Sequence, residues 1–76
     1  MLIDNNTFYI IRKVHQLTTY QMADKLGYSQ TYVSFIERGV ENVTDNVKNQ
    51  LIEVFGLDAE KLAEIKAIYK KFNLSK

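Results

Sequence analysis

The sequence predicts an all-α fold, and three of its features carry that prediction. Apolar residues recur every three or four positions along most of the chain, and no segment shows the sustained apolar–polar alternation of a strand. The chain has no proline, and each of its three glycines follows a segment of helical periodicity, where a left-handed residue commonly ends a helix. Serine, threonine, aspartate or asparagine precedes each such segment, and these residues are the preferred N-caps of helices.

The first half of the chain contains three expected helices. We expect them over about residues 6–15, 19–27 and 30–38, so the second and third are short. Apolar residues at helical spacing give each helix one core-facing side. The expected N-caps are Asp4 or Asn5, Thr18 and Ser29, and the expected core residues are Phe8, Ile11, Val14, Met22, Ala23, Leu26, Val33 and Ile36.

The fourth expected helix follows the N-cap Thr44 and ends at Phe55, where Gly56 closes it. We expect it to bury Val47, Leu51, Val54 and Phe55.

The fifth expected helix is an amphipathic C-terminal segment over residues 58–73, capped by Asp58. We expect Leu62 and Ile65 to close the core of the domain. The wide apolar stripe of this helix is longer than that role requires. The stripe continues beyond them through Ile68, Tyr69 and Phe72. These three residues form either a two-fold dimer interface or further packing within the monomer.

Composition argues against an enzyme and against a metal site. The chain has no cysteine, and its single histidine, His15, is interpreted as a helix cap or surface residue. The sequence contains no glycine-rich phosphate loop and no Ser-His-Asp set on a plausible pocket. Asp24, Glu37 and Glu53 are better explained as structural or surface acids. We therefore expect no catalytic residue, no metal and no cofactor.

The length of 76 residues indicates one domain over residues 1–76. No stretch approaches the ~20 apolar residues of a membrane span, and the N-terminus lacks the pattern of a secretory signal. The expectation is a cytoplasmic protein that makes no membrane contact. The net charge of +1 is low for a protein that binds nucleic acid.

The second and third expected helices suit a helix-turn-helix unit over residues 17–39. Only Gly27, Tyr28 and Ser29 separate them, and two short helices joined by a tight glycine turn are typical of that unit. Gly27 suits a turn position with positive φ, where a Cβ would clash. The small Ala23, four residues earlier, lets the two helices cross closely.

The string from Leu17 to Gly39 closely resembles the lambda-repressor/Cro-like (XRE) helix-turn-helix family. The resemblance extends upstream to Ile11-Arg12 and downstream to Leu57 and Leu62. It implies a five-helix DNA-binding domain whose third helix, about residues 29–38, is the recognition helix. It also implies a structural, partly buried salt bridge between Arg12 and Glu37. The matching positions are Leu17-Thr18, Met22-Ala23, Leu26-Gly27, Ser29-Gln30, Val33-Ser34 and Ile36-Glu37-Arg38-Gly39.

The resemblance also implies which residues touch DNA, since the first turns of the recognition helix enter the major groove. Helical periodicity agrees, because it leaves one side of the third helix facing outward. Gln30 is the best base reader, since a glutamine bonds adenine N6 and N7 together. The expected base contacts are Gln30, Thr31, Ser34 and Phe35, and the expected phosphate contacts are Thr19, Tyr28, Arg38 and Gly39.

The sequence departs from the family at three places. Thr19 replaces a glutamine that braces the recognition-helix glutamine in many members, so we expect weaker support for Gln30. Phe35 replaces a frequent polar or basic residue, and it suits either thymine methyls or a protein contact. The loop over residues 40–46 carries two acids and no base. Because phosphate neutralisation supplies most nonspecific affinity, a monomer should bind weakly.

The expected partner is double-stranded DNA, bound by a homodimer at a palindromic operator whose half-sites lie about 34–36 Å apart. The function that fits best is a transcriptional repressor from a phage, mobile element or bacterial chromosome. Two alternatives remain open. The first is a protein-interaction module on the same fold, such as a phage antirepressor or a co-regulator of another repressor. The second is an antitoxin-type autoregulator.

Overall fold

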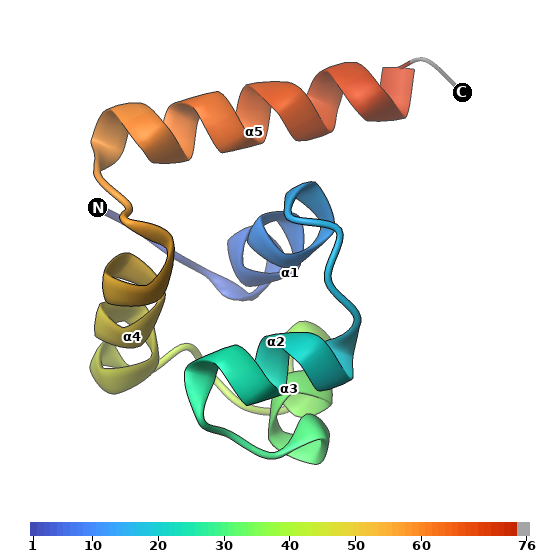
Figure 1. Cartoon of the computed structure of the whole chain (residues 1–76), viewed down its shortest axis with the longest axis vertical. Coiled ribbons are helices and arrows are strands. Elements are labelled where there is room, and N and C mark those ends of the chain that lie inside the picture. Colours follow the sequence, from blue (N-terminus) through green and yellow to red (C-terminus); the bar gives the residue numbers. More distant parts are fainter. Residues whose placement is uncertain (75–76) are drawn as a thin grey trace.

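The computed structural model describes residues 1–74, and all the regular structure within them is helical (Figure 1). This confirms the all-α prediction and the five expected segments. The helices are α1 (Asn5–Val14), α2 (Thr19–Leu26), α3 (Gln30–Glu37), α4 (Asp45–Phe55) and α5 (Ala59–Leu74).

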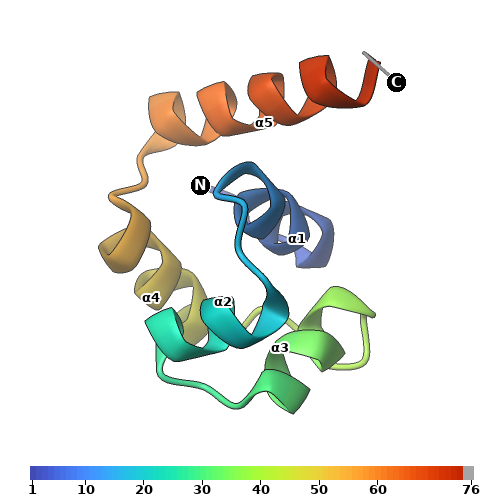
Figure 2. The ribbon, with the colours of Figure 1, turned by 45° about the vertical axis from the view of Figure 1, so that its right-hand side comes forward.

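The helices are arranged so that α5 and α3 lie on opposite sides of the molecule. In both views α5 runs across α1, while α2 and α3 pack together at the other end and α4 connects the two regions (Figure 2). One hydrophobic core joins all five helices and the segments that flank α1 and α5. Its largest fully buried side chains are Phe8, Ile11, Met22, Ile36, Leu51, Ile65, Val33 and Val47.

Side-chain caps start the helices where the sequence predicts them. Thr18 accepts a hydrogen bond from the Gln21 backbone N–H, and the Gln21 side chain accepts one from the Thr18 N–H, which is a full capping box. At α1 the cap is Asp4, which accepts bonds from the Thr7 hydroxyl at 2.7 Å and from the Thr7 N–H at 2.8 Å. These two bonds stabilise the carboxylate and hold the pKa of Asp4 below its usual value. His15 is the C-cap of α1.

The end of α4 differs from the prediction. Val54 was expected in the core but is 37% exposed, and Phe55 is only half-buried. Val54 lies in the last turn of α4, and Leu57 from the connection to α5 enters the core after it. Helical periodicity assigned a face to Val54, but it did not show where the core ends. Val14 is likewise half-buried, whereas Ile3 and Ile10, which were not expected there, are core residues.

The ion pair between Arg12 and Glu37 ties α1 to the end of α3. Arg12 Nε donates to Glu37 Oε2 at 2.6 Å, and Nη2 donates to Oε1 at 2.8 Å, so the contact is bidentate. The third guanidinium nitrogen, Nη1, donates to the Leu17 carbonyl at 2.8 Å. The two side chains are only 12% and 10% exposed. The hydrogen bonds to Glu37 raise the pKa of Arg12, so the guanidinium keeps its charge throughout the ordinary pH range.

Asn5 makes a second connection between α1 and the segment that follows α3. Its Nδ2 donates to the Ile36 carbonyl and to the Glu41 carbonyl, both at 2.7 Å. The amide therefore satisfies one carbonyl at the end of α3, where helical partners run out, and one in the following loop. The sequence suggested Asn5 as an alternative cap for α1, but the structure gives it this bridging position instead.

Removing one partner of the ion pair should destabilise the fold. We expect Glu37→Ala to lower the free energy of unfolding by about 3 kcal/mol, because it leaves the Arg12 guanidinium nearly buried without its anion. Urea denaturation followed by circular dichroism measures this loss. The matched control is Glu53→Ala, which removes an exposed acid from α4 and should change the stability by less than about 0.5 kcal/mol.

The double variant Arg12→Met/Glu37→Leu should recover most of that loss, because no buried charge remains. If Glu37→Ala unfolds at the same urea concentration as the parent protein, the ion pair does not hold α1 to α3.

Asn5 and Asn6 offer a matched pair of adjacent asparagines in α1. Asn5→Ala should lower the free energy of unfolding by about 1–2 kcal/mol, since the Glu41 carbonyl loses the Asn5 donor and the Ile36 carbonyl retains only the Gly39 N–H. Asn6→Ala removes an exposed amide from the same turn and should have little effect. Thermal unfolding of the two variants measures the difference. Equal melting temperatures would show that Asn5 does not hold the loop.

Candidate functional site

The segment between α2 and α3 is a tight turn that depends on Gly27. This residue has φ = +76°, and the Tyr28 N–H donates to the Ala23 carbonyl at 2.9 Å across the helix end. No atom lies within 4 Å of the position that a Cβ would occupy. Glycine is therefore favoured here by the left-handed backbone itself and not by lack of space. Ala23 is buried at 3% exposure, as the close packing of α2 and α3 requires.

The two sides of α3 differ as the periodicity predicts. Val33 and Ile36 have no exposed surface and anchor the helix in the core. On the outer side Gln30 and Thr31 are exposed and Ser34 is half-buried. Since Ser29 caps α3 by accepting a hydrogen bond from Tyr32 N–H, these polar residues begin immediately after the helix start.

Gln30 is held by a hydrogen bond from α3 to α2. Its Nε2 donates to Thr19 Oγ1 at 3.0 Å, across eleven positions of sequence. Thr19 therefore supports Gln30 through one direct hydrogen bond, and the expectation that this support is weaker than that of a glutamine stays a prediction. No sequence pattern signals this contact, because it depends on the angle at which α2 and α3 cross.

Phe35 and Arg38 form a pair at the end of α3. The guanidinium carbon of Arg38 lies 5.1 Å from the centre of the Phe35 ring, which is cation–π distance. Phe35 is half-buried and not fully exposed as expected, and Arg38 covers one face of its ring. Arg38 itself is exposed, so its guanidinium remains accessible while the ring limits its movement.

Tyrosines border the outer surface of the turn. The Tyr28 and Tyr32 rings meet edge to face, with centres 5.2 Å apart, and both are half-buried against the core. Tyr20 is 61% exposed. A hollow of about 220 Å³ lies between the outer sides of α2 and α3, and Tyr20, Ala23, Asp24, Tyr28 and Gln30 line it.

The loop after α3 is held close to the helix end. Gly39 has φ = +77°, and its N–H donates to the Ile36 carbonyl at 3.1 Å. The Phe35 carbonyl accepts from the N–H groups of Val40 and Glu41. Asp45 lies in the first turn of α4, where its carboxylate interacts favourably with the positive end of the helix dipole. One of the two acids in this loop therefore has a structural explanation.

The residues expected at a dimer interface lie on α5, away from α3. Ile68 is 48% and Phe72 is 65% exposed, so both leave apolar surface in contact with solvent. Tyr69 differs from the other two, because it is half-buried and meets the Tyr9 ring edge to face within the same chain, at 6.3 Å between centres. The stripe therefore divides between packing inside the monomer and exposed surface.

Neither a metal-binding cluster nor a membrane-spanning helix is found within residues 1–74. No group of three or more His, Cys, Asp or Glu side chains is placed to hold a metal ion in this region. None of the helices described there combines the length and the apolar character needed to cross a membrane.

Comparison with known proteins agrees with this geometry. A family model described as helix-turn-helix matches residues 9–62, which is more than half of the chain and includes the whole of α2, α3 and α4. Searches of curated proteins and of solved structures returned no match. The matched region contains the capped turn at Gly27 and the ion pair between Arg12 and Glu37. The chain belongs to the lambda-repressor/Cro-like (XRE) helix-turn-helix family of DNA-binding regulators.

Proposed function

We propose that this DNA-binding regulator is a transcriptional repressor that binds its operator as a dimer, with α3 in the major groove. The observation that carries the proposal is the hydrogen bond from Gln30 to Thr19, at the exposed start of α3. It fixes a base-reading amide before DNA arrives, so less side-chain freedom is lost on binding.

The fixed amide retains the groups that adenine requires. Gln30 uses one Nε2 hydrogen for Thr19, which leaves one N–H donor and the Oε1 acceptor. Adenine presents N7 as an acceptor and N6 as a donor in the major groove, so a glutamine can bond both. We therefore assign an A·T pair to the position that Gln30 reads.

The remaining base contacts follow from positions on the outer side of α3. Thr31 is exposed one residue further along, and its hydroxyl or methyl can meet a base edge. Ser34 and Phe35 lie in the following turn and are both half-buried. Phe35 offers only the part of its ring that Arg38 does not cover, which suits an apolar contact with a thymine methyl.

Phosphate contacts are assigned to residues around the two ends of α3. Arg38 has an exposed guanidinium that Phe35 holds in place, and Thr19 and Tyr28 offer hydroxyl groups near its start. The Gly39 N–H already donates to the Ile36 carbonyl. The proposed contact at Gly39 is therefore the close approach of a phosphate to a backbone that carries no side chain.

Dimerisation follows from the small number of positive charges near α3. Few phosphates are neutralised by one copy, so its affinity and its salt dependence are both low. Two copies double these contacts at a palindromic site. We assign the interface to Ile68, Tyr69 and Phe72, and the exposed apolar surface of Ile68 and Phe72 is the support for it. A dimer bound in this way would cover promoter DNA and act as a repressor.

Selection of bound sequences from random DNA tests the proposal as a whole. It should return a palindrome with an A·T pair at one fixed position in each half-site. Absence of salt-dependent binding to any sequence at micromolar protein would overturn it.

Gln30→Ala should cost about 1–3 kcal/mol of discrimination, which is about tenfold to hundredfold in relative affinity, at that A·T pair alone. Thr19→Val should give a smaller loss at the same pair, because the amide remains but is no longer fixed. Fluorescence anisotropy on duplexes that differ at one base pair measures both effects. Asn49→Ala, which removes an exposed amide from α4, is the control and should leave discrimination unchanged.

Ile68→Glu should weaken both self-association and operator binding, because it places a charge in the proposed interface. The control is Ala67→Glu, which adds the same charge at the adjacent exposed position of α5 but outside the apolar stripe. Analytical ultracentrifugation measures the first effect and anisotropy the second. If both variants dimerise equally well, Ile68 is not at the interface.

A further inference from the structure

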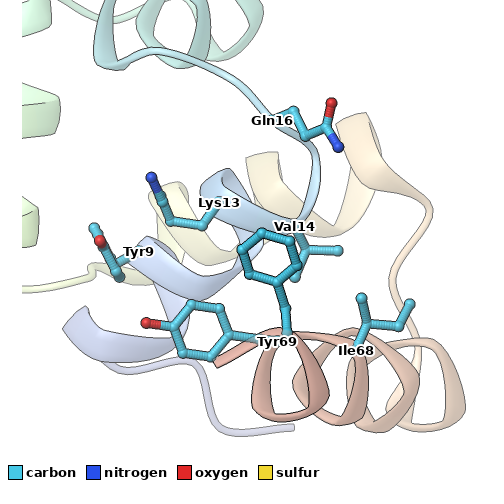
Figure 3. A pocket seen from close by; sticks show the side chains of 7 residues that line it. Tyr9, Lys13, Val14, Gln16, Ile68 and Tyr69 are labelled. Atoms are coloured by element: carbon cyan, nitrogen blue, oxygen red, sulfur yellow. The ribbon is translucent and has the colours of Figure 1, made fainter. Parts of the chain in front are cut away.

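A cavity of about 250 Å³ lies between α1 and the second half of α5, away from the DNA-reading face. Figure 3 shows side chains from α1, from the residues just after it and from α5 around this space, with the ends of Lys13 and Gln16 directed outward at its edge. Its lining consists of Tyr9, Lys13, Val14, Gln16, Ile68, Tyr69 and Phe72. Nothing in the proposed reading of DNA uses Tyr9, Lys13, Val14 or Gln16.

The lining combines apolar and polar surface in similar amounts, so a ligand that fits it needs both an apolar part and a polar group. The aliphatic part comes from Val14 and Ile68, and the aromatic part from the rings of Tyr9, Tyr69 and Phe72. The polar groups are the two phenol hydroxyls, the Gln16 amide and the Lys13 ammonium. Lys13 is the only charged group in the lining, and it makes no ion pair with any other residue in the range 1–74.

The aromatic wall of the cavity is already ordered. The Tyr9 ring meets the Tyr69 ring edge to face, and the Arg12 guanidinium lies 5.3 Å from the centre of the Tyr9 ring. Arg12 is itself fixed by its bidentate contact with Glu37. A ligand would therefore meet a wall that needs little rearrangement, which lowers the entropic cost of binding.

Gln16 occupies a backbone conformation that favours glycine. Its φ is +57°, and it is the one residue other than glycine with positive φ in the part of the chain that the structure describes. A glycine at this position would relieve the backbone. The chain has glutamine at this position, and the Gln16 side chain lines the cavity, where its amide can bond a ligand.

We infer that this cavity binds a small aromatic carboxylate, with its ring between Tyr69, Ile68 and Phe72 and its carboxylate on Lys13. The volume supports this size, because a buried apolar cavity of about 150 Å³ is enough for benzene. The remaining space fits a second ring or an acid group. A lone ammonium beside phenol and amide donors selects an anion over a neutral or cationic ligand.

The consequence of binding rests on the proposed function. The cavity shares Ile68, Tyr69 and Phe72 with the proposed dimer interface, so a bound ligand and a second copy of the chain contact the same side chains. The ligand is then an effector that weakens dimerisation and lowers operator affinity.

The test uses 2-naphthoate as the probe and its neutral amide, 2-naphthamide, as the matched comparison. Two-dimensional NMR titration of the intact protein should show saturable shifts centred on the lining residues. 2-Naphthoate should bind about tenfold more tightly than the amide, which is the gain expected for one charge-assisted hydrogen bond. Lys13→Met should remove this preference, whereas Lys61→Met, at the other end of α5, should retain it.

Gln16→Gly gives a second readout. It should raise the melting temperature by relieving the left-handed backbone and should weaken naphthoate binding at the same time. The titration contains no DNA, so its failure does not depend on whether the operator proposal holds. The inference is overturned if shifts are absent, if Lys13→Met and Lys61→Met bind alike, or if dilution alone shifts the lining residues and naphthoate does not. That last result would show that a second copy fills the cavity.

Discussion

The rest of the structure depends on the contacts that the guanidinium of Arg12 makes. It joins three segments at once, since it bonds Glu37 at the end of α3, the Leu17 carbonyl before α2, and the face of the Tyr9 ring in α1. Each nitrogen of the guanidinium has its own acceptor, and a nearly buried charge requires such partners to offset the loss of its hydration. This one side chain therefore helps to set the orientation of α3 relative to α1, together with Asn5 and the shared core.

Contacts at both ends fix α3, and one of them, the hydrogen bond from Gln30 to Thr19, involves a residue of its outer side. Its start is set by the Ser29 cap and by the hydrogen bond between Gln30 and Thr19, and its end by Glu37 and by the Asn5 amide. Because these contacts leave Thr31 and Ser34 unconstrained, the sequence can vary on the outer side without loss of the fold. Most of the contacts that fix this eight-residue helix therefore lie outside the set of residues that we propose to read bases, and Gln30 belongs to both groups.

The distribution of polar and apolar surface separates two functions along the molecule. The side that we propose to read DNA carries hydroxyls, an amide and a single arginine that packs on Phe35. The α5 side carries exposed apolar surface at Ile68 and Phe72, next to a cavity with one lysine. Weak phosphate neutralisation on the first side and apolar surface on the second are consistent with binding that depends on assembly.

The sequence by itself determined the helices and their order, because caps, glycines and apolar spacing are local signals. Thr18, Ser29, Thr44 and Gly27 have the positions that the pattern predicts. The resemblance to a known family added the pairing of Arg12 with Glu37. Only the tertiary structure decided where the core ends, so that Leu57 and not Val54 is buried. It alone brought Thr19 to Gln30 and Asn5 to the loop after α3, since each contact spans eleven or more residues and depends on helix crossing angles that spacing does not encode.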